Sequence, residues 1–251
     1  MRGIVTAFAV LGICLGPVAL VRADDQADAK AVIEKAIKAE GADKLAKLQG
    51  LTMKMSGKFY GMGDGIDYAG DWKVQLPDKT RNEITIDANG QKFTFIQVFN
   101  GDKGWISMNG EVSDANKDQI DEAKEELYDS QVTNLYPLLE KEFKLSPLGD
   151  SKVGDKEVVG VKVSNKGHRD INLFFDKKTS FLLKTETHVK DLMGGGGEVA
   201  QETLYDDYKD ADGVKYPYKV LINRDGKKFV DGEVKEIKLV EKIDDSSFGK
   251  P

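Results

Sequence analysis

Cysteine is almost absent from this chain of 251 residues, because the single one, Cys14, lies in the apolar N-terminal stretch. The sequence from residue 24 to 251 therefore has no thiol. This excludes disulfide bonds, a thiolate nucleophile and a thiolate metal site in that part of the chain. A fold without disulfide bonds has to be stabilised by its hydrophobic core.

Motifs for catalysis and metal binding are also missing. The two histidines, His168 and His188, lie in different predicted strands with no ligand spacing such as H-x-x-x-H, and both are interpreted as surface residues. The glycine-rich runs at 61–65 and 194–197 lack the strand and helix that flank a phosphate-binding loop. No G-x-S-x-G motif occurs. We therefore expect a protein that is not an enzyme and that has no metal or other cofactor.

Basic residues do not outnumber acidic ones. The chain has 37 lysines and arginines against 43 acidic residues, which gives a formal net charge of −6. This balance argues against a nucleic-acid partner and gives no general attraction to anionic membrane surfaces. Charged residues make up 32% and hydrophobic residues 40%, as in a globular protein, and one all-β domain can fill this length.

The one long hydrophobic run lies at the N-terminus. Residues 4–21 are apolar or small, and Ala23 is a suitable residue for cleavage. The pattern predicts a secretory signal peptide over residues 1–23 and a single mature domain over 24–251, periplasmic or secreted, with no membrane span after cleavage. An uncleaved membrane anchor is the alternative, because the run is almost long enough to cross a bilayer, but Pro17 interrupts it.

Much of the mature sequence alternates between apolar and polar residues. From Ile66 to Leu76 every second residue is on one face, including Tyr68 and Trp72. Such alternation predicts a strand with one buried and one solvated face. Similar segments recur from residue 51 to 240, and Asn89-Gly90 is a strong hairpin signal. We predict a mainly β protein with about eleven strands in a curled antiparallel meander, an open or half β-barrel.

Two segments have helical spacing instead. Residues 28–40 carry an apolar stripe, which predicts an N-terminal helix. A helical insertion over about 113–141, capped by Ser113 or Asp114, interrupts the strands.

The insertion has one apolar and one acidic side, so its apolar side should face the sheet. Because it leaves the sheet after Trp105, we expect it to form a lid near Trp105 and the strand of Phe93 and Phe95. The stripe consists of Ile120, Leu127, Leu135, Leu138 and Leu139.

Short patches then allow a comparison with a known family. They are Phe99-Asn100-Gly101, Gly104-Trp105, Leu173-Phe174-Phe175-Asp176, Leu182-Leu183, Tyr208, Asp212-Gly213-Val214-Lys215-Tyr216-Pro217 and Ser247-Phe248-Gly249-Lys250-Pro251. In this order they resemble the periplasmic outer-membrane lipoprotein-sorting, or LolA/LolB-like, superfamily. The resemblance covers nearly the whole mature chain.

The resemblance implies a half-barrel with a helical lid around an apolar cavity. It also implies a carrier in outer-membrane biogenesis that transports a lipid, or the acyl chain of a lipoprotein, without catalysis. No motif of the family places its binding residues on this chain, so the cavity residues are predicted from the apolar strand faces and the lid. They are Met53, Met55, Phe59, Tyr68, Trp72, Phe93, Phe95, Trp105, Leu127, Leu135, Leu138 and Leu139.

The same side chains allow a second interpretation. They can pack against the helices and leave no cavity, as in a cell-envelope interaction or scaffold domain with a protein partner and no ligand. A continuous apolar pocket of about 300 Å³ or more would favour the carrier.

Overall fold

The structure is a computed structural model that describes residues 23–251 except 42–43, 45, 89 and 194. The predicted signal peptide therefore lies outside the described residues, apart from Ala23. In the part of the chain that is described, no helix is both long and apolar enough to cross a membrane.

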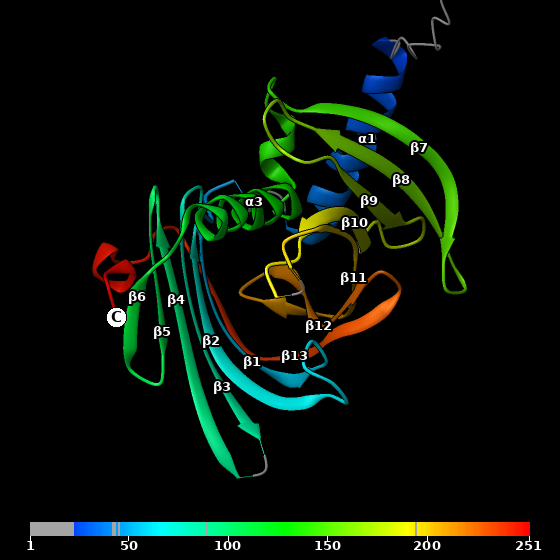
Figure 1. The fold of residues 1–251 in the computed structure, drawn as a ribbon. Coiled ribbons are helices and arrows are strands. Elements are labelled where there is room, and N and C mark those ends of the chain that lie inside the picture. Colours follow the sequence, from blue (N-terminus) through cyan, green and yellow to red (C-terminus); the bar gives the residue numbers. More distant parts are fainter. Residues whose placement is uncertain (1–22, 42–43, 45, 89, 194) are drawn as a thin grey trace, which may run out of the picture.

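One antiparallel sheet contains every strand of the described residues (Figure 1). The strands are β1 (Gly50–Phe59), β2 (Ile66–Gln75), β3 (Lys79–Ala88), β4 (Gln91–Asn100), β5 (Lys103–Met108), β6 (Glu111–Asp114), β7 (Lys144–Val153), β8 (Lys156–Ser164), β9 (Ile171–Asp176), β10 (Leu182–Lys190), β11 (Glu198–Ala211), β12 (Val214–Arg224) and β13 (Lys227–Val240). Their order in the sheet is β6-β5-β4-β3-β2-β1-β13-β12-β11-β10-β9-β8-β7.

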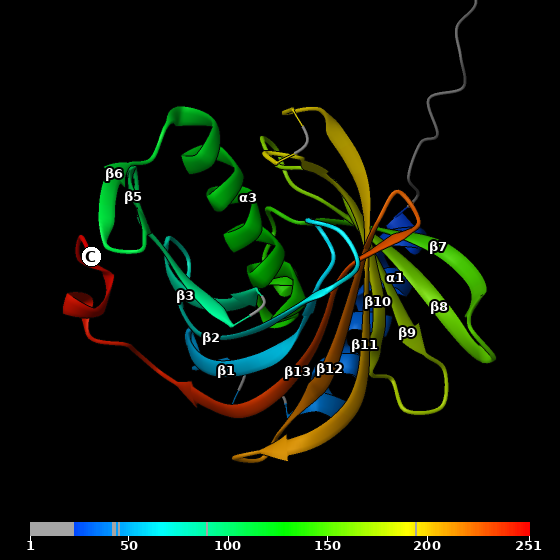
Figure 2. The ribbon, with the colours of Figure 1, turned by 60° about the horizontal axis from the view of Figure 1, so that its bottom comes forward.

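The chain order explains this arrangement. Within β1–β6 and within β7–β13 each strand pairs with the next in sequence, and β1 pairs with β13, so that two meanders join into one sheet. The sheet stays open because β6 and β7 lie at its two edges. It curls around the helix α3 (Lys117–Thr133), as Figure 2 shows. The predicted fold class, a curled antiparallel meander with helices, is confirmed.

The predicted number of strands is too low, because the sheet has thirteen. One unpredicted strand is β6, which occupies the residues where we expected the helix cap. The cap is instead Asn116, whose side-chain Oδ1 accepts the backbone N–H of Gln119 at 3.0 Å. The Gln119 side chain accepts the backbone N–H of Asn116 at 2.9 Å. This reciprocal capping box satisfies two backbone donors, which a cap at Ser113 or Asp114 would leave to other partners.

Helix α1 (Ala23–Glu40) and the 3₁₀ helix η1 (Tyr136–Leu139) pack with the end of α3 on the concave face of the sheet. They cover β7 to β10, and we call this covered region the filled half. Its core includes Ile33, Val132 and Leu173, each completely buried. Gly41 follows α1 with a φ of +113°, and a Cβ atom there would lie 2.7 Å from the carbonyl oxygen of Gly213. Glycine thus lets the end of α1 approach the β11–β12 turn.

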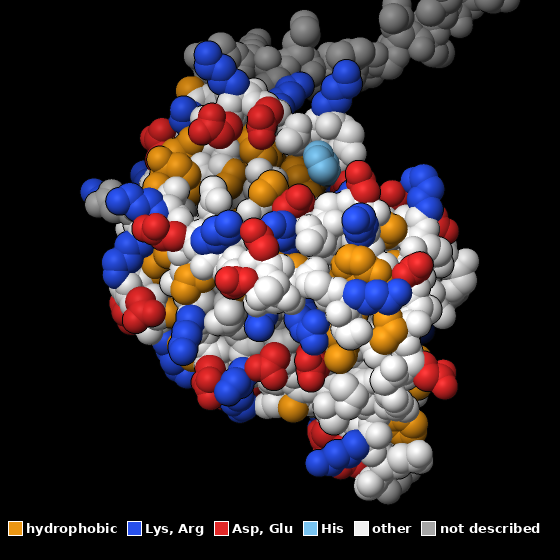
Figure 3. Space-filling model, turned by 90° about the vertical axis from the view of Figure 1, so that its left-hand side faces the viewer, with side chains coloured by type: hydrophobic (Ala, Val, Ile, Leu, Met, Phe, Trp, Pro, Cys, Tyr) orange, Lys and Arg blue, Asp and Glu red, His pale blue; other side chains and the backbone are white. Residues whose placement is uncertain are grey.

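The outer face of the sheet has its own small clusters. Val98 packs there against Ile243 and Phe248 from the C-terminal segment, where the 3₁₀ helix η2 (Asp245–Phe248) lies. On the side of the molecule in Figure 3, charged side chains of both signs are interspersed with hydrophobic ones.

Candidate ligand-binding site

The concave face continues beyond the helices over β12, β13 and β1 to β5, and we call this region the open half. Strand register places its side chains in rows. Met53 pairs with Trp72 on one side and Ile237 on the other, and Leu51 pairs in the same way with Val74 and Leu239. Residues paired across neighbouring strands share a face of the sheet. The open half is therefore apolar across β13, β1 and β2, whereas the row of Trp72 continues on β3 and β4 with the polar residues Asn82 and Gln97.

Trp72 lies across the centre of this surface. A Cβ atom at Gly70 would be 3.0 Å from the indole ring, so the absence of a side chain at Gly70 makes room for it. The Tyr68 ring meets the Trp72 ring edge-on at 6.2 Å. Tyr68 is buried, and its burial raises the pKa of its phenol to about 12, so the hydroxyl is neutral.

Exposure separates the open half from the filled half. In the cluster around Trp72, only Met55, Tyr68 and Val234 are buried. Nine other apolar side chains of that cluster are only partly buried, among them Met53, Trp72 and Ile84. Farther along the same face, Phe93 is 37% and Met108 is 60% exposed. Partly exposed apolar surfaces of this kind are typical of interaction sites.

A pocket of about 150 Å³ lies where the open half meets the helices. Leu51, Val74 and Leu239 form one wall, adjacent in register to Met53 and Trp72. The pocket is smaller than the 300 Å³ that we set as the mark of a carrier. This pocket alone is therefore too small to enclose an acyl chain, and the open half beside it provides further apolar surface.

Glu40, the last residue of α1, lies in the wall of this pocket and is only 7% exposed. Its Oε1 atom accepts the backbone N–H of Leu182 at 3.4 Å. Burial raises the pKa of Glu40 from 4.5 to about 8, and this hydrogen bond only partly offsets the effect. The C-terminal end of a helix also disfavours a negative charge. The carboxyl group is therefore mostly protonated at neutral pH.

Three tyrosines, Tyr205, Tyr208 and Tyr216, line the same pocket. The Tyr208 hydroxyl donates to the carbonyl oxygen of Leu182 at 2.6 Å, and its ring stacks on Phe181 at 4.6 Å. Burial raises the pKa of Tyr216 to about 12. These phenols are neutral, so they add hydrogen-bonding groups and aromatic surface to the pocket without charge.

Helix α3 is held over the concave side chiefly at its contact with the start of β9. The Arg169 guanidinium donates from Nη1 to Glu122 at 2.7 Å and from Nε to Asp129 at 3.1 Å, with a further bond from Nη2 to Asp129. Arg169 is 12% and Glu122 11% exposed. At the other side of the helix, Lys124 pairs with Asp102 in the exposed β4–β5 turn. The cover is thus fixed firmly at the filled half and weakly at the open half.

His168 takes part in the same contact, which the sequence did not indicate. Its ring stacks on the Tyr128 ring of α3 at 4.1 Å, and its Nδ1 atom lies 2.9 Å from Glu125. It precedes β9 in a turn, whereas we expected a surface strand residue. The sequence offered one signal for this contact. His168 and Arg169 are adjacent basic residues, and the predicted insertion has an acidic side with which they could pair.

The structure brings most of the predicted cavity residues together. Met53, Met55, Phe59, Tyr68 and Trp72 form one cluster on the concave face. Phe93 and Phe95 extend the same face, because they pair with Ile86 and Ile84.

Trp105 lies on the opposite face, which corrects its predicted position. It pairs with Val98 and packs in the outer cluster with Ile243 and Phe248. Strand β4 is apolar on both faces. Trp105 lies on the same face as Ile96 and Val98, and therefore points away from Phe93 and Phe95.

The lid leucines also differ from the prediction. Leu135, Leu138 and Leu139 pack in the filled half against α1 and the strands from β7 onward, away from Phe93 and Phe95. Leu127 is buried, 3% exposed. The chain turns after α3 at Leu135, which has a φ of +64°, and this turn directs η1 back toward the filled half.

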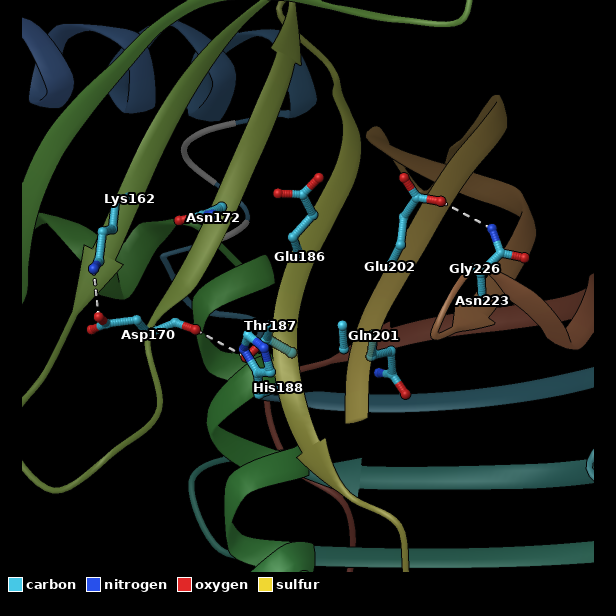
Figure 4. A pocket seen from close by; sticks show the side chains of 11 residues that line it. Lys162, Asp170, Asn172, Glu186, Thr187, His188, Gln201, Glu202, Asn223 and Gly226 are labelled. Carbon is cyan, nitrogen blue, oxygen red and sulfur yellow. Dashed lines mark hydrogen bonds and ion pairs between the residues drawn. The ribbon is translucent and has the colours of Figure 1, made fainter. Parts of the chain in front are cut away.

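A second, larger hollow of about 510 Å³ lies on the outer face and is polar (Figure 4). One row of paired residues crosses it from β8 to β12: Lys162, Asn172, Glu186, Glu202 and Asn223. Its charges are mutually satisfied, because Lys184 contacts both glutamates and Lys162 pairs with Asp170. The side chains that line this hollow are mostly polar or charged, unlike those of the open half.

Fold and site together define a half-barrel with a helical cover and an apolar half whose side chains are mostly only partly buried. No protein-family model matches the sequence, and no curated protein matches it. Among solved structures, the chain has the fold of a LolA superfamily protein from Nitrosomonas europaea, with 11% sequence identity and a TM-score of 0.55 over 88% of this chain and 97% of that one.

Two further structures have the same fold. A DUF1329 family protein from Desulfovibrio piger has 13% identity and a TM-score of 0.55, over 88% of this chain and 97% of that one. An outer membrane lipoprotein-sorting protein domain from Vibrio parahaemolyticus has 10% identity and a TM-score of 0.53, over 86% of this chain and 97% of that one. The predicted resemblance to the LolA/LolB-like fold is confirmed.

Proposed function

We propose that this protein is a non-enzymatic binding protein or carrier for a lipid or acylated ligand, with the acyl chain lying on the open half. The observation that carries the proposal is the row of partly buried apolar side chains around Trp72, on a face whose other half is closed by helices. This surface is partly exposed to solvent, and an acyl chain gains about 0.8 kcal/mol for each methylene group that it buries there.

The position of α3 supports the same proposal. Its exposed attachment through Lys124 and Asp102 can break without loss of the buried contacts around Arg169. A cover with one firm and one weak attachment can open at the weak side and close again over a chain. The exposed Phe93 and Met108 would then gain a partner.

The names of two structural neighbours suggest where such a protein works. One is a LolA superfamily protein and the other a lipoprotein-sorting domain. With the predicted signal peptide, this favours a periplasmic carrier for lipids or lipoprotein acyl chains. The absence of a catalytic motif in the sequence supports a role without chemistry.

Two measurements test this proposal. Mass spectrometry of the mature protein should find co-purifying lipids or fatty acids. Hydrogen exchange should be faster in α3, residues 117–133, than in β2, residues 66–75, without ligand, and a long-chain fatty acid should slow the exchange of α3. If no lipid is bound and no lipid changes the exchange, the carrier proposal fails and an interaction domain without a ligand is the better account.

A further inference from the structure

The pocket beside the open half contains a buried acid without a cationic partner. Glu40 is 93% buried, yet in the described part of the chain no lysine, arginine or histidine forms an ion pair with it. The basic residue in the pocket wall, Lys215, pairs with Asp210 at 3.3 Å instead. A buried carboxyl group normally has such a partner or is strongly unfavourable.

Aromatic side chains surround this acid. Tyr205, Tyr208 and Tyr216 come from β11 and β12 and line the pocket together with Glu40. Aromatic faces attract cations through the ring quadrupole, and a set of aromatic rings with a carboxylate is the usual environment for an organic ammonium group. At about 150 Å³, the pocket has room for a head group and not for a long chain.

Resting on the proposed function, we infer that this pocket binds the ammonium group of an amphiphile, with Glu40 as counter-ion and the three tyrosines as its aromatic wall. The attached chain would pass from Leu51 and Val74 to Met53 and Trp72, which follow in the next row of the same face. The ligand class is then an alkylammonium compound, such as a lipid with an amine-bearing head group.

The protonation of Glu40 fits this role. The acid is mostly neutral in the free protein because burial raises its pKa to about 8. An ammonium ion in the pocket favours the charged carboxylate, so the site is complete only when its ligand is bound. The three tyrosine phenols and the N–H of Leu182 supply no positive charge near Glu40, and Lys215, the basic residue of the pocket wall, pairs with Asp210.

An NMR titration with paired probes tests the inference. The probes are choline and its neutral isostere in which carbon replaces nitrogen, and decyltrimethylammonium and decanol below their aggregation limits. We expect about tenfold tighter binding of each cation than of its neutral partner, as for a desolvated cation–π site. Glu40→Gln should reduce this preference to about twofold, whereas Glu34→Gln, an exposed residue on the same helix, should leave it unchanged.

Substitutions of Tyr216 test the aromatic wall without changing the charge of the pocket. Tyr216→Phe keeps the aromatic face and should keep the preference, and Tyr216→Leu should reduce it. If decanol binds as tightly as decyltrimethylammonium in the unmodified protein, the ammonium site is wrong and the carrier proposal stands. If choline shows a preference that depends on Glu40 but decanol does not bind, the ammonium site stands and the carrier proposal fails.

Discussion

The filled half and the open half belong to one face of one sheet, yet they differ in what covers them. Val161 and Leu173 in the filled half are completely buried beneath α1 and the end of α3. Met53 and Trp72, on the same face, are only partly buried. The difference shows that the helices protect one part of the apolar face and leave the other accessible.

The two halves also differ in their methionines. The described core cluster of the filled half contains none, whereas Met53 and Met55 belong to the cluster around Trp72 in the open half. Methionine adapts to irregular partners, so this composition suits a surface that receives chains of varied shape.

Glu40, at the boundary of the two halves, should give the largest effect. Its folded pKa of about 8 exceeds the ordinary 4.5, so the unfolded state ionises first as pH rises, and stability is lost between these values. The complete loss is about 5 kcal/mol. Glu40→Gln lacks this loss, so its stability relative to the unmodified protein should rise by that amount from pH 4 to pH 9.

Urea denaturation at several pH values measures this difference. Glu34→Gln, on the exposed side of α1, is the control and should show little pH-dependent change. A constant difference between Glu40→Gln and the unmodified protein would mean that the Glu40 carboxyl group is ionised normally.

The firm attachment of α3 should give the next largest effect. Arg169→Met leaves the carboxylates of Glu122 and Asp129 without their cation, which should cost about 3–5 kcal/mol. The matched change at the weak attachment, Lys124→Met, should cost less than about 1 kcal/mol because the ion pair with Asp102 is exposed. Thermal and urea unfolding measure both, and equal costs would contradict the asymmetry of the cover.

One isoleucine from each half of the concave face provides a matched comparison of how tightly the two halves are packed. Ile171→Ala in the filled half should cost about 2–5 kcal/mol, because the residue is 2% exposed and leaves a cavity. Ile84→Ala in the open half should cost about 1 kcal/mol, since its site is partly exposed to water. Similar costs in urea unfolding would indicate that the open half is packed as tightly as the filled one.

Trp72→Ala should lower the free energy of unfolding by little, although the truncated side chain is large. A fully buried tryptophan costs about 3–5 kcal/mol on truncation, and the partly exposed Trp72 should cost about 1–2 kcal/mol. Trp72→Ala should, however, weaken the binding of a long-chain fatty acid. A destabilisation above 3 kcal/mol, without change in binding, would assign Trp72 to a closed core.

Much of the fold followed from periodicity. The alternation in Ile66–Leu76 and the Asn89-Gly90 hairpin depend on local physics, and the structure has strands at both places. The pairing of β1 with β13 depends on contacts between distant segments, so the sequence does not reveal it. Strand β6 is short and exposed, and therefore has no apolar pattern to detect.

The site was harder to predict because both halves have the same alternating pattern. Val161 and Val163 alternate with polar residues just as Met53 and Met55 do. Only the position of the helices in the structure distinguishes the two pairs. Trp105 was misplaced because β4 is apolar on both faces, and Ile243 and Phe248 fold back over the outer one. Glu40 was missed because an acid at the end of an amphipathic helix is usually solvated.

The two tryptophans allow the most direct test of the central claim, that an acyl chain binds the open half. Trp72 lies on the concave face and Trp105 on the outer one. In Trp105→Phe, only Trp72 fluoresces, and a spin-labelled fatty acid should quench it in a saturable way. In Trp72→Phe, the remaining Trp105 should be quenched only as by a free quencher in water. Equal quenching of both residues, or none of either, would contradict the account.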